Sequence, residues 1–190
     1  EQAQGGVLTD LCHPAYLARY FLGRPESVSA AFGYVTGREV EDNAVVTLRY
    51  PGGTLGVVET AYVTQYSPFS IEVHGTRGSV LYSEPGIGEL VARRAAPPAP
   101  SAVGVAPVGP DGKLRIRSAS IDGAAGQWLV QEVTGAAPPA FNQWVTHLQQ
   151  GTTASENIEL GLDLTALVEA ANRSAATGQV VRLDELEHAG

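Results

Sequence analysis

An aspartate and a histidine near the start of the chain are the side chains best suited to chemistry. Asp10 and His13 lie in the stretch 5–16, after two glycines and before Pro14. A neutral imidazole can accept a proton near neutral pH, and a nearby carboxylate can orient the ring and stabilise the charge it gains. The pair therefore indicates general acid–base chemistry. A histidine beside a proline also serves as a helix cap or a core residue, and the residues alone leave that alternative open.

The element that must position His13 is a helix that follows it. Pro14 suits the first helical position, because the N–H that it lacks would have no partner there. The residue before a proline avoids the α conformation, so we expect His13 at or just before the helix cap. Apolar residues recur every three or four positions until Gly23, which ends the helix. His13 is thus predicted at a helix N-terminus, where the helix dipole disfavours the imidazolium form.

A run of strands follows, and helices flank it. Residue alternation and turn motifs predict strands over 26–35, 44–50, 54–63, 69–74, 79–82, 89–93, 113–118, 127–133 and 179–183. Two more helices are predicted over 138–150 and 153–177, the second opened by a capping box at 153–156. This order predicts an α+β fold with an open, mostly antiparallel (mixed) sheet and helices packed on one face.

The open face of that sheet needs a cover. We expect Thr60, Tyr62 and Thr64, or their neighbours, to pack on a partner subunit or on another domain. The chain is predicted to form a single domain, 1–190. Within it, residues 95–112 are rich in Pro, Ala and Gly, which is typical of a flexible loop.

Composition excludes several classes of protein. The net charge of −8 argues against nucleic acid and against an anionic membrane surface as partners. No apolar run is long enough to span a membrane. The single cysteine, Cys12, fits a reducing compartment and so a cytoplasmic location. The chain contains no methionine, and we therefore expect it to be an internal fragment of a longer protein.

Motifs for cofactors and nucleophiles are missing from the sequence. No Gly-x-Gly-x-x-Gly follows a strand, no P-loop is present, and no serine stands in a Gly-x-Ser-x-Gly elbow. The chain thus has no nucleotide cradle of its own. Cys12 and His13 are adjacent and point apart, and no second His/Cys cluster accompanies them, so no metal site is expected.

The stretch Gly5-Gly6-Val7-Leu8-Thr9-Asp10, with His13 and Gly23, resembles the second-domain signature of the glucose–fructose oxidoreductase/inositol dehydrogenase (Gfo/Idh/MocA) family. Further similar segments follow in matching order: Val40-Glu41-Asp42-Asn43-Ala44, Tyr50-Pro51-Gly52-Gly53, Ile71 to Val80 around His74-Gly75-Thr76-Arg77-Gly78, and Leu167 to Val181. The resemblance covers nearly the whole chain.

This resemblance implies a two-domain oxidoreductase. Members have an N-terminal Rossmann domain that binds NAD or NADP, then an α+β domain whose open sheet builds the substrate pocket and the oligomer interface. The chain is similar to that second domain without the first. By resemblance, His13 is the general base that takes the hydroxyl proton and Asp10 orients it, while a lysine belongs to the missing domain. The fragment alone is expected to be inactive.

Two positions depart from the family pattern. The family usually has three residues between the aspartate and the histidine, whereas here only Leu11 and Cys12 separate them. The third position after the histidine is often aspartate and is Tyr16 here, which we take as a candidate substrate-binding residue.

The function implied by the resemblance is that of a substrate-binding and assembly domain. The whole protein would be an NAD(P)-dependent oxidoreductase acting on a sugar, polyol or related hydroxy compound, and a homo-oligomer through the open sheet face. Two alternatives stay open: a glycoside hydrolase of the same family that retains its NAD, and a non-catalytic oligomerisation or binding module. The shortened Asp10/His13 spacing favours the module.

Overall fold

The computed structural model describes residues 5–64, 67–84, 113–131 and 137–187, which fall into two compact units. Unit 1 comprises Glu1–Val63 and Pro139–Gly190, and unit 2 comprises Thr64–Pro138. Each unit contains one four-stranded antiparallel sheet, and the helices among the described residues belong to unit 1. The predicted α+β class with antiparallel strands is confirmed.

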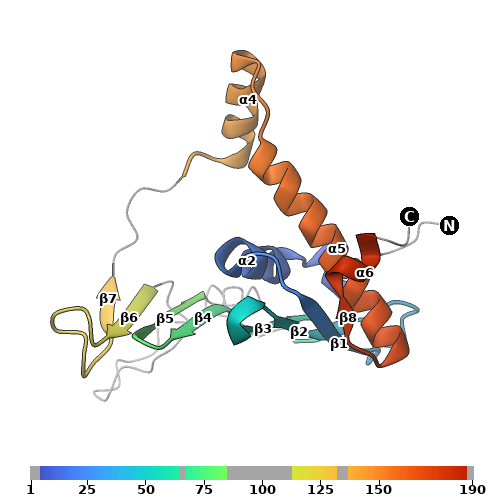
Figure 1. Ribbon diagram of the computed structural model, residues 1–190, viewed down its shortest axis with the longest axis horizontal. Coiled ribbons are helices and arrows are strands. Elements are labelled where there is room, and N and C mark those ends of the chain that lie inside the picture. Colours follow the sequence, from blue (N-terminus) through green and yellow to red (C-terminus); the bar gives the residue numbers. More distant parts are fainter. Residues whose placement is uncertain (1–4, 65–66, 85–112, 132–136, 188–190) are drawn as a thin grey trace, which may run out of the picture. The chain divides into compact units, whose positions relative to one another are not determined.

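The sheet of unit 1 has the strand order β3-β2-β1-β8 (Figure 1). Its strands are β1 Ser27–Gly33, β2 Asn43–Arg49, β3 Leu55–Ala61 and β8 Val181–Arg182. A 3-10 turn, Pro51–Gly53, joins β2 to β3 as the sequence predicts. Gly52 and Gly53 both have positive φ, 77° and 87°, a conformation that glycine adopts without strain. The proline and the two glycines of this turn thus set where the hairpin reverses.

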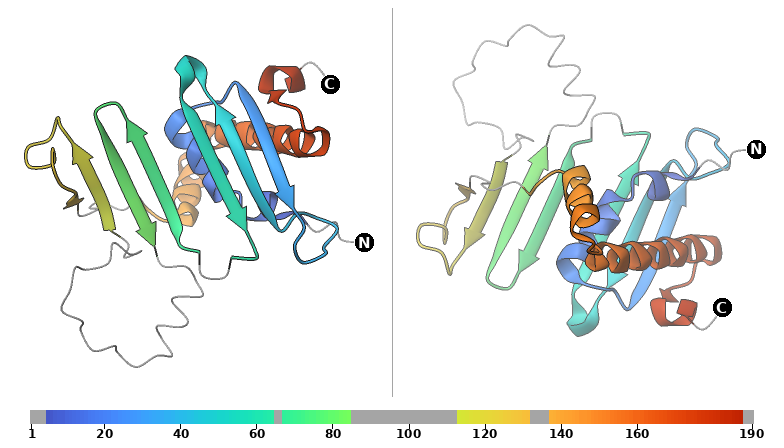
Figure 2. Two further views of the ribbon diagram at one scale, coloured as in Figure 1. Left: turned by 90° about the horizontal axis from the view of Figure 1, so that it is seen from below. Right: turned by 90° about the horizontal axis from the view of Figure 1, so that it is seen from above.

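Helices α1, α2 and α5 lie against one face of the unit 1 sheet, and the other face is open (Figure 2). Helix α2 contacts β3 and α5, and α5 contacts β1 and β8. The helices are α1 Val7–Asp10, α2 His13–Leu22, α4 Ala140–Gln150, α5 Ser155–Thr177 and α6 Leu183–Glu187. One sheet face therefore packs a core, as predicted from the order of elements.

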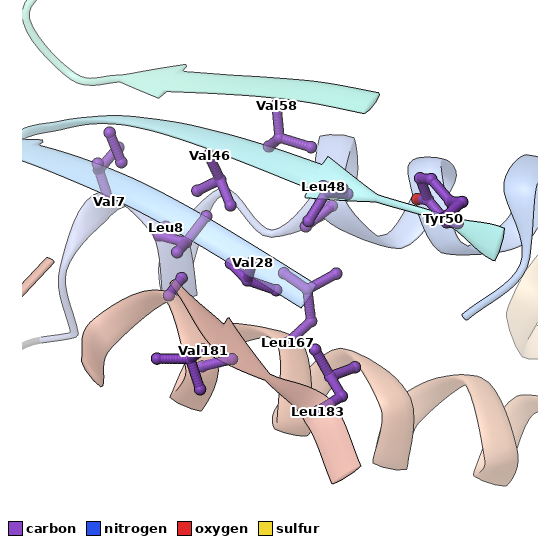
Figure 3. Close-up of a cluster of buried hydrophobic side chains, with 14 residues drawn as sticks. Val7, Leu8, Val28, Val46, Leu48, Tyr50, Val58, Leu167, Val181 and Leu183 are labelled. Carbon is purple, nitrogen blue, oxygen red and sulfur yellow. The ribbon is translucent and has the colours of Figure 1, made fainter. Parts of the chain in front are cut away.

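The core of unit 1 forms between the sheet and α1, α2 and α5 (Figure 3). Along β2 the inward side chains of Val46 and Leu48 are fully buried, while Thr47 between them and Arg49 after them are exposed. Leu167 of α5 meets them from the helical layer and is also fully buried. Burying a side chain of this size stabilises the fold by roughly 1.5–3 kcal/mol.

Three local predictions differ from the structure. Helix α2 begins at His13, with Cys12 at the N-cap and Pro14 second, one residue earlier than expected. Helix α5 begins at Ser155 behind Ala154, which makes no side-chain capping bond, so the predicted capping box does not form. Thr60 is buried, at 4% exposure, on the core side of β3 and not on the open face. The open side of β3 instead carries Val57, because successive residues of a strand point to opposite faces.

Unit 2 is a meander with the order β4-β5-β6-β7. Its strands are β4 Phe69–Gly75, β5 Gly78–Glu84, β6 Lys113–Ser118 and β7 Leu129–Gln131. The predicted strand 89–93 and the predicted loop 95–112 lie outside the described residues. Among the residues that the structure does describe, no helix has the length and apolarity of a bilayer span.

Candidate active site

Helix α1 carries Asp10, and the buried carboxylate of Glu41 holds the start of that helix. The amide of Val7 donates to the Glu41 carbonyl oxygen at 3.0 Å, and the amide of Leu8 donates to its side-chain Oε1 at 3.1 Å. Val7 and Leu8 are themselves fully buried in the core. A four-residue helix has little stability of its own, so these contacts fix where Asp10 lies.

The two glycines before α1 make room for two carboxylates. A Cβ on Gly6 would lie 1.7 Å from Glu41 Oε2, and a Cβ on Gly5 would lie 2.7 Å from Asp10 Oδ1. Real Cβ atoms do not come that close to other atoms. A side chain at either position would therefore displace a carboxylate, and neither glycine is needed for a turn, since neither has a positive φ.

The Asp10 carboxylate is bound by Tyr62, a residue 52 positions away. The phenol of Tyr62 donates to Asp10 Oδ2 at 2.5 Å. Tyr62 directly follows β3, where its amide also donates to the carbonyl oxygen of Asp42 at 2.8 Å. The guanidinium of Arg38 lies 5.2 Å from the centre of the Tyr62 ring, within range of a cation–π contact. Asp10, Tyr62 and Arg38 thus form a small polar cluster at the end of α1.

The environment of Tyr62 keeps its phenol protonated. Burial, followed by the hydrogen bond to Asp10 and the charge of Asp10, raises the pKa of Tyr62 to about 12, and Arg38 opposes this. At neutral pH the phenol is therefore a donor, and an ionised carboxylate offers only acceptors. A hydrogen bond from a neutral donor to a charged acceptor is stronger than one between two neutral groups.

His13 is exposed at the first position of α2. No hydrogen bond or ion pair joins it to Asp10 within the described part of the chain, so the orienting role of Asp10 stays a prediction. Tyr16, one turn further along, is half-buried and stacks against Tyr20 with 6.3 Å between ring centres. Its predicted contact with substrate also stays a prediction.

Across the described residues, no three His, Cys, Asp or Glu side chains come close enough together to hold a metal ion. A hollow of about 610 Å³ lies in unit 2, lined by residues of the β4–β5 hairpin, of β6 and of the loop after β6, including Arg77 and Arg117. It contains none of the predicted site residues. His74 lies beside it, where its Nδ1 is 2.9 Å from Ser79 Oγ.

Residues 1–81, which include Asp10, His13, Arg38 and Tyr62, match the model of the GFO/IDH/MocA C-terminal domain family. The first 81 residues of the chain are thus similar to the Gfo/Idh/MocA C-terminal domain. The resemblance inferred from the sequence is confirmed, and the site described above lies wholly within the matched segment.

One curated relative of the chain is a 1,5-anhydro-D-fructose reductase from Ensifer adhaerens. It is 30% identical over 84 residues, which are 42% of this chain and 25% of the reductase. The chain therefore spans only a part of that relative.

Solved structures show the same fold over almost the whole chain. A protein from Klebsiella pneumoniae assigned as an oxidoreductase matches with a TM-score of 0.65 at 27% identity. The match covers 94% of this chain and 50% of the Klebsiella pneumoniae chain. An oxidoreductase from Agrobacterium radiobacter, solved with NAD+, L-tartaric acid and magnesium, matches with a TM-score of 0.66 at 21% identity, covering 97% and 51%. The chain spans about half the length of these proteins.

Two of the site's residues could not be found from the sequence. The sequence predicts Tyr62 on the open sheet face, and it gives Glu41 no role of its own. A Tyr residue after a strand and a Glu residue in a turn are common, and nothing in their spacing points to Asp10 or to α1. Only the family segment around Glu41 indicated that this turn matters.

Proposed function

We propose that the chain is the substrate-binding and assembly domain of an NAD(P)-dependent oxidoreductase acting on a sugar, polyol or related hydroxy compound. The cluster at the end of α1 carries this proposal: an exposed carboxylate held by Tyr62, three residues before an exposed imidazole, within the family segment. The names of the relatives support the substrate class, since one is a reductase of an anhydro sugar. The NAD+ bound to the Agrobacterium radiobacter oxidoreductase supports the cofactor.

The exposed His13 imidazole and the open Asp10 carboxylate oxygen are groups that can accept a hydrogen bond from a substrate hydroxyl. NAD or NADP, bound mainly by a separate N-terminal Rossmann domain, supplies the hydride acceptor in this proposal. His13 takes the proton of the hydroxyl group as the carbon is oxidised. Asp10 orients His13 or the substrate through the carboxylate oxygen that Tyr62 leaves open, and Tyr16 contacts the substrate from the next turn of α2.

The assembly role rests on the open face of the unit 1 sheet. Val45, Leu55 and Val57 are 44%, 60% and 71% exposed there, on two neighbouring strands. Apolar side chains gathered on one exposed face commonly mark a contact surface. We propose that a second copy of the protein covers this face. The single cysteine, Cys12, is the sequence feature that supports a cytoplasmic location for the assembly.

The test of the proposed activity uses the full-length protein that contains this chain. Formation of NADH or NADPH is recorded against a panel of sugars and polyols for the wild type, His13→Ala and His74→Ala. Loss of a general base lowers turnover by about a hundredfold or more. We expect that loss in His13→Ala and near wild-type turnover in His74→Ala, which has no part in the proposed site.

Other outcomes would redirect the assignment. Turnover unchanged in His13→Ala would remove His13 from the mechanism. If no substrate is turned over although the cofactor binds and the oligomer is stable, the dehydrogenase proposal fails, and hydrolysis of glycosides by the same protein is the next activity to assay.

A further inference from the structure

The Asp10 carboxylate has two oxygens in different surroundings. Oδ2 accepts the phenol of Tyr62, and Oδ1 lies on the side where Gly5 has no side chain. One oxygen is thus held, and the other is left for a further donor. An exposed aspartate at the end of a four-residue helix would otherwise be free to change its rotamer.

We propose that Tyr62 is a positioning residue for Asp10, with its phenol fixing the carboxylate so that Oδ1 is presented to the reacting groups. This role rests on the proposed oxidoreductase function. It explains how Asp10 can be oriented when no hydrogen bond to His13 is present in the described residues. Fixing a catalytic group before substrate arrives lowers the entropic cost of reaching the reactive geometry.

The phenol is not needed to hold the end of β3 in place. The amide of Tyr62 already donates to the Asp42 carbonyl oxygen, and the Tyr62 ring lies beneath the Arg38 guanidinium. Both contacts survive when the hydroxyl group alone is removed. Tyr62→Phe therefore separates the bond to Asp10 from the packing of the strand end. The charged groups that act on Tyr62 are Asp10, Arg38 and Glu41, and none of them is changed by this substitution.

Kinetics of the full-length protein test the positioning role. A hydrogen bond to a charged group is lost in Tyr62→Phe, and we expect kcat to fall by about tenfold or more while the KM for the cofactor stays within twofold. In the Asp10→Asn background the same substitution should cost less than twofold, because the two residues act through one contact. Tyr50→Phe is the matched control, since the Tyr50 phenol also donates one bond, to the Ala18 carbonyl oxygen at 3.3 Å, but does not reach Asp10.

A spectroscopic measurement tests the contact itself without turnover. In protein labelled with carbon-13 at the tyrosine Cζ, the Tyr62 resonance is the one that disappears in Tyr62→Phe. Asp10→Asn should shift this resonance at neutral pH and leave the Tyr50 resonance in place, because the Tyr62 phenol loses its charged acceptor. An unshifted Tyr62 resonance would overturn the contact and the positioning role together.

The kinetic outcomes separate the two proposals. If the wild type turns over a hydroxy compound and Tyr62→Phe has the same kcat, the positioning role is overturned and the oxidoreductase function stands. An equal fall of kcat in Tyr50→Phe would also overturn it, by showing a general effect of losing a tyrosine hydroxyl. A wild-type protein with no turnover of any hydroxy compound would overturn the function and the positioning role with it.

Discussion

Asp42 is a fully buried carboxylate that organises the connection between β1 and β2. It accepts hydrogen bonds from the amide of Val35 at 3.0 Å, from the amide and hydroxyl of Thr36 at 2.6 and 2.7 Å, and from the Asn43 side chain at 2.9 Å. Burial would raise the pKa of Asp42, but these hydrogen bonds lower it to about 2. Buried charge is tolerated here because every bond favours the ionised form.

The stability of the fold should therefore depend on Asp42 in acid. Because its pKa is lower in the folded than in the unfolded chain, the unfolded chain takes up the proton first as the pH falls. The contribution of Asp42 is present above about pH 3.8 and is lost between there and about pH 2. We expect urea unfolding of Asp42→Asn at several pH values to show lower stability at neutral pH and a weaker loss across this window.

Thr36→Val is a milder substitution at the same hydrogen-bond network. It removes the hydroxyl donor and leaves the backbone donors of Val35 and Thr36, so we expect a smaller destabilisation than for Asp42→Asn. An Asp42→Asn protein with the wild-type pH profile would show that another carboxyl group governs acid unfolding.

At the scale of elements, replacing two different glycines should change the stability of the fold in opposite directions. Gly6 precedes α1 and lies against the Glu41 carboxylate, whereas Gly161 lies within α5 with open space around its Cβ position. An alanine at position 6 must push Glu41 off the amide of Leu8, which leaves buried polar groups without partners. An alanine in a helix interior instead lowers the entropy that the chain loses on folding.

We predict that Gly6→Ala lowers the free energy of unfolding by about 1–3 kcal/mol and that Gly161→Ala raises it by up to about 1 kcal/mol. Denaturant unfolding of both variants measures the difference, and each serves as the control for the other, because the added methyl group is the same. Equal effects of the two substitutions would show that Glu41 moves aside at no cost.

At the scale of the whole molecule, the proposed contact between copies lies on the open face of the unit 1 sheet. Val57 is 71% exposed and stands opposite Thr47 on the neighbouring strand. A lysine there would have to lose its hydration to enter an interface between copies. Val35, 74% exposed in the connection after β1, offers a matched site away from the strands of that face.

We predict that Val57→Lys shifts the full-length protein toward smaller species, with the dissociation constant of the assembly raised by about tenfold or more, and that Val35→Lys leaves it unchanged. Sedimentation velocity across a range of protein concentrations measures the shift. A Val57→Lys protein with the wild-type distribution would place the contact between copies elsewhere.

The sequence by itself determined most of the elements and the resemblance to a family. Three local patterns predicted their elements correctly: the alternation in β2, the Pro-Gly-Gly turn and the apolar spacing of α5. Such patterns can be read from the sequence because the geometry of the backbone sets their period. The signature around Asp10 and His13 likewise lies in one short segment. The buried face of β3 was harder to predict from the sequence. Residues such as Val57 and Thr60 fit either face of a strand, and a strand can turn either face to the core.

Only the tertiary structure decided what surrounds Asp10. Tyr62 reaches it because β3 ends beside α1, and α1 lies there because Glu41 binds its first amides and Gly6 lets that carboxylate approach. Each of these contacts joins segments more than thirty positions apart. Hydrogen bonds between distant segments depend on how the whole core packs, and no spacing within a short stretch of sequence records that packing.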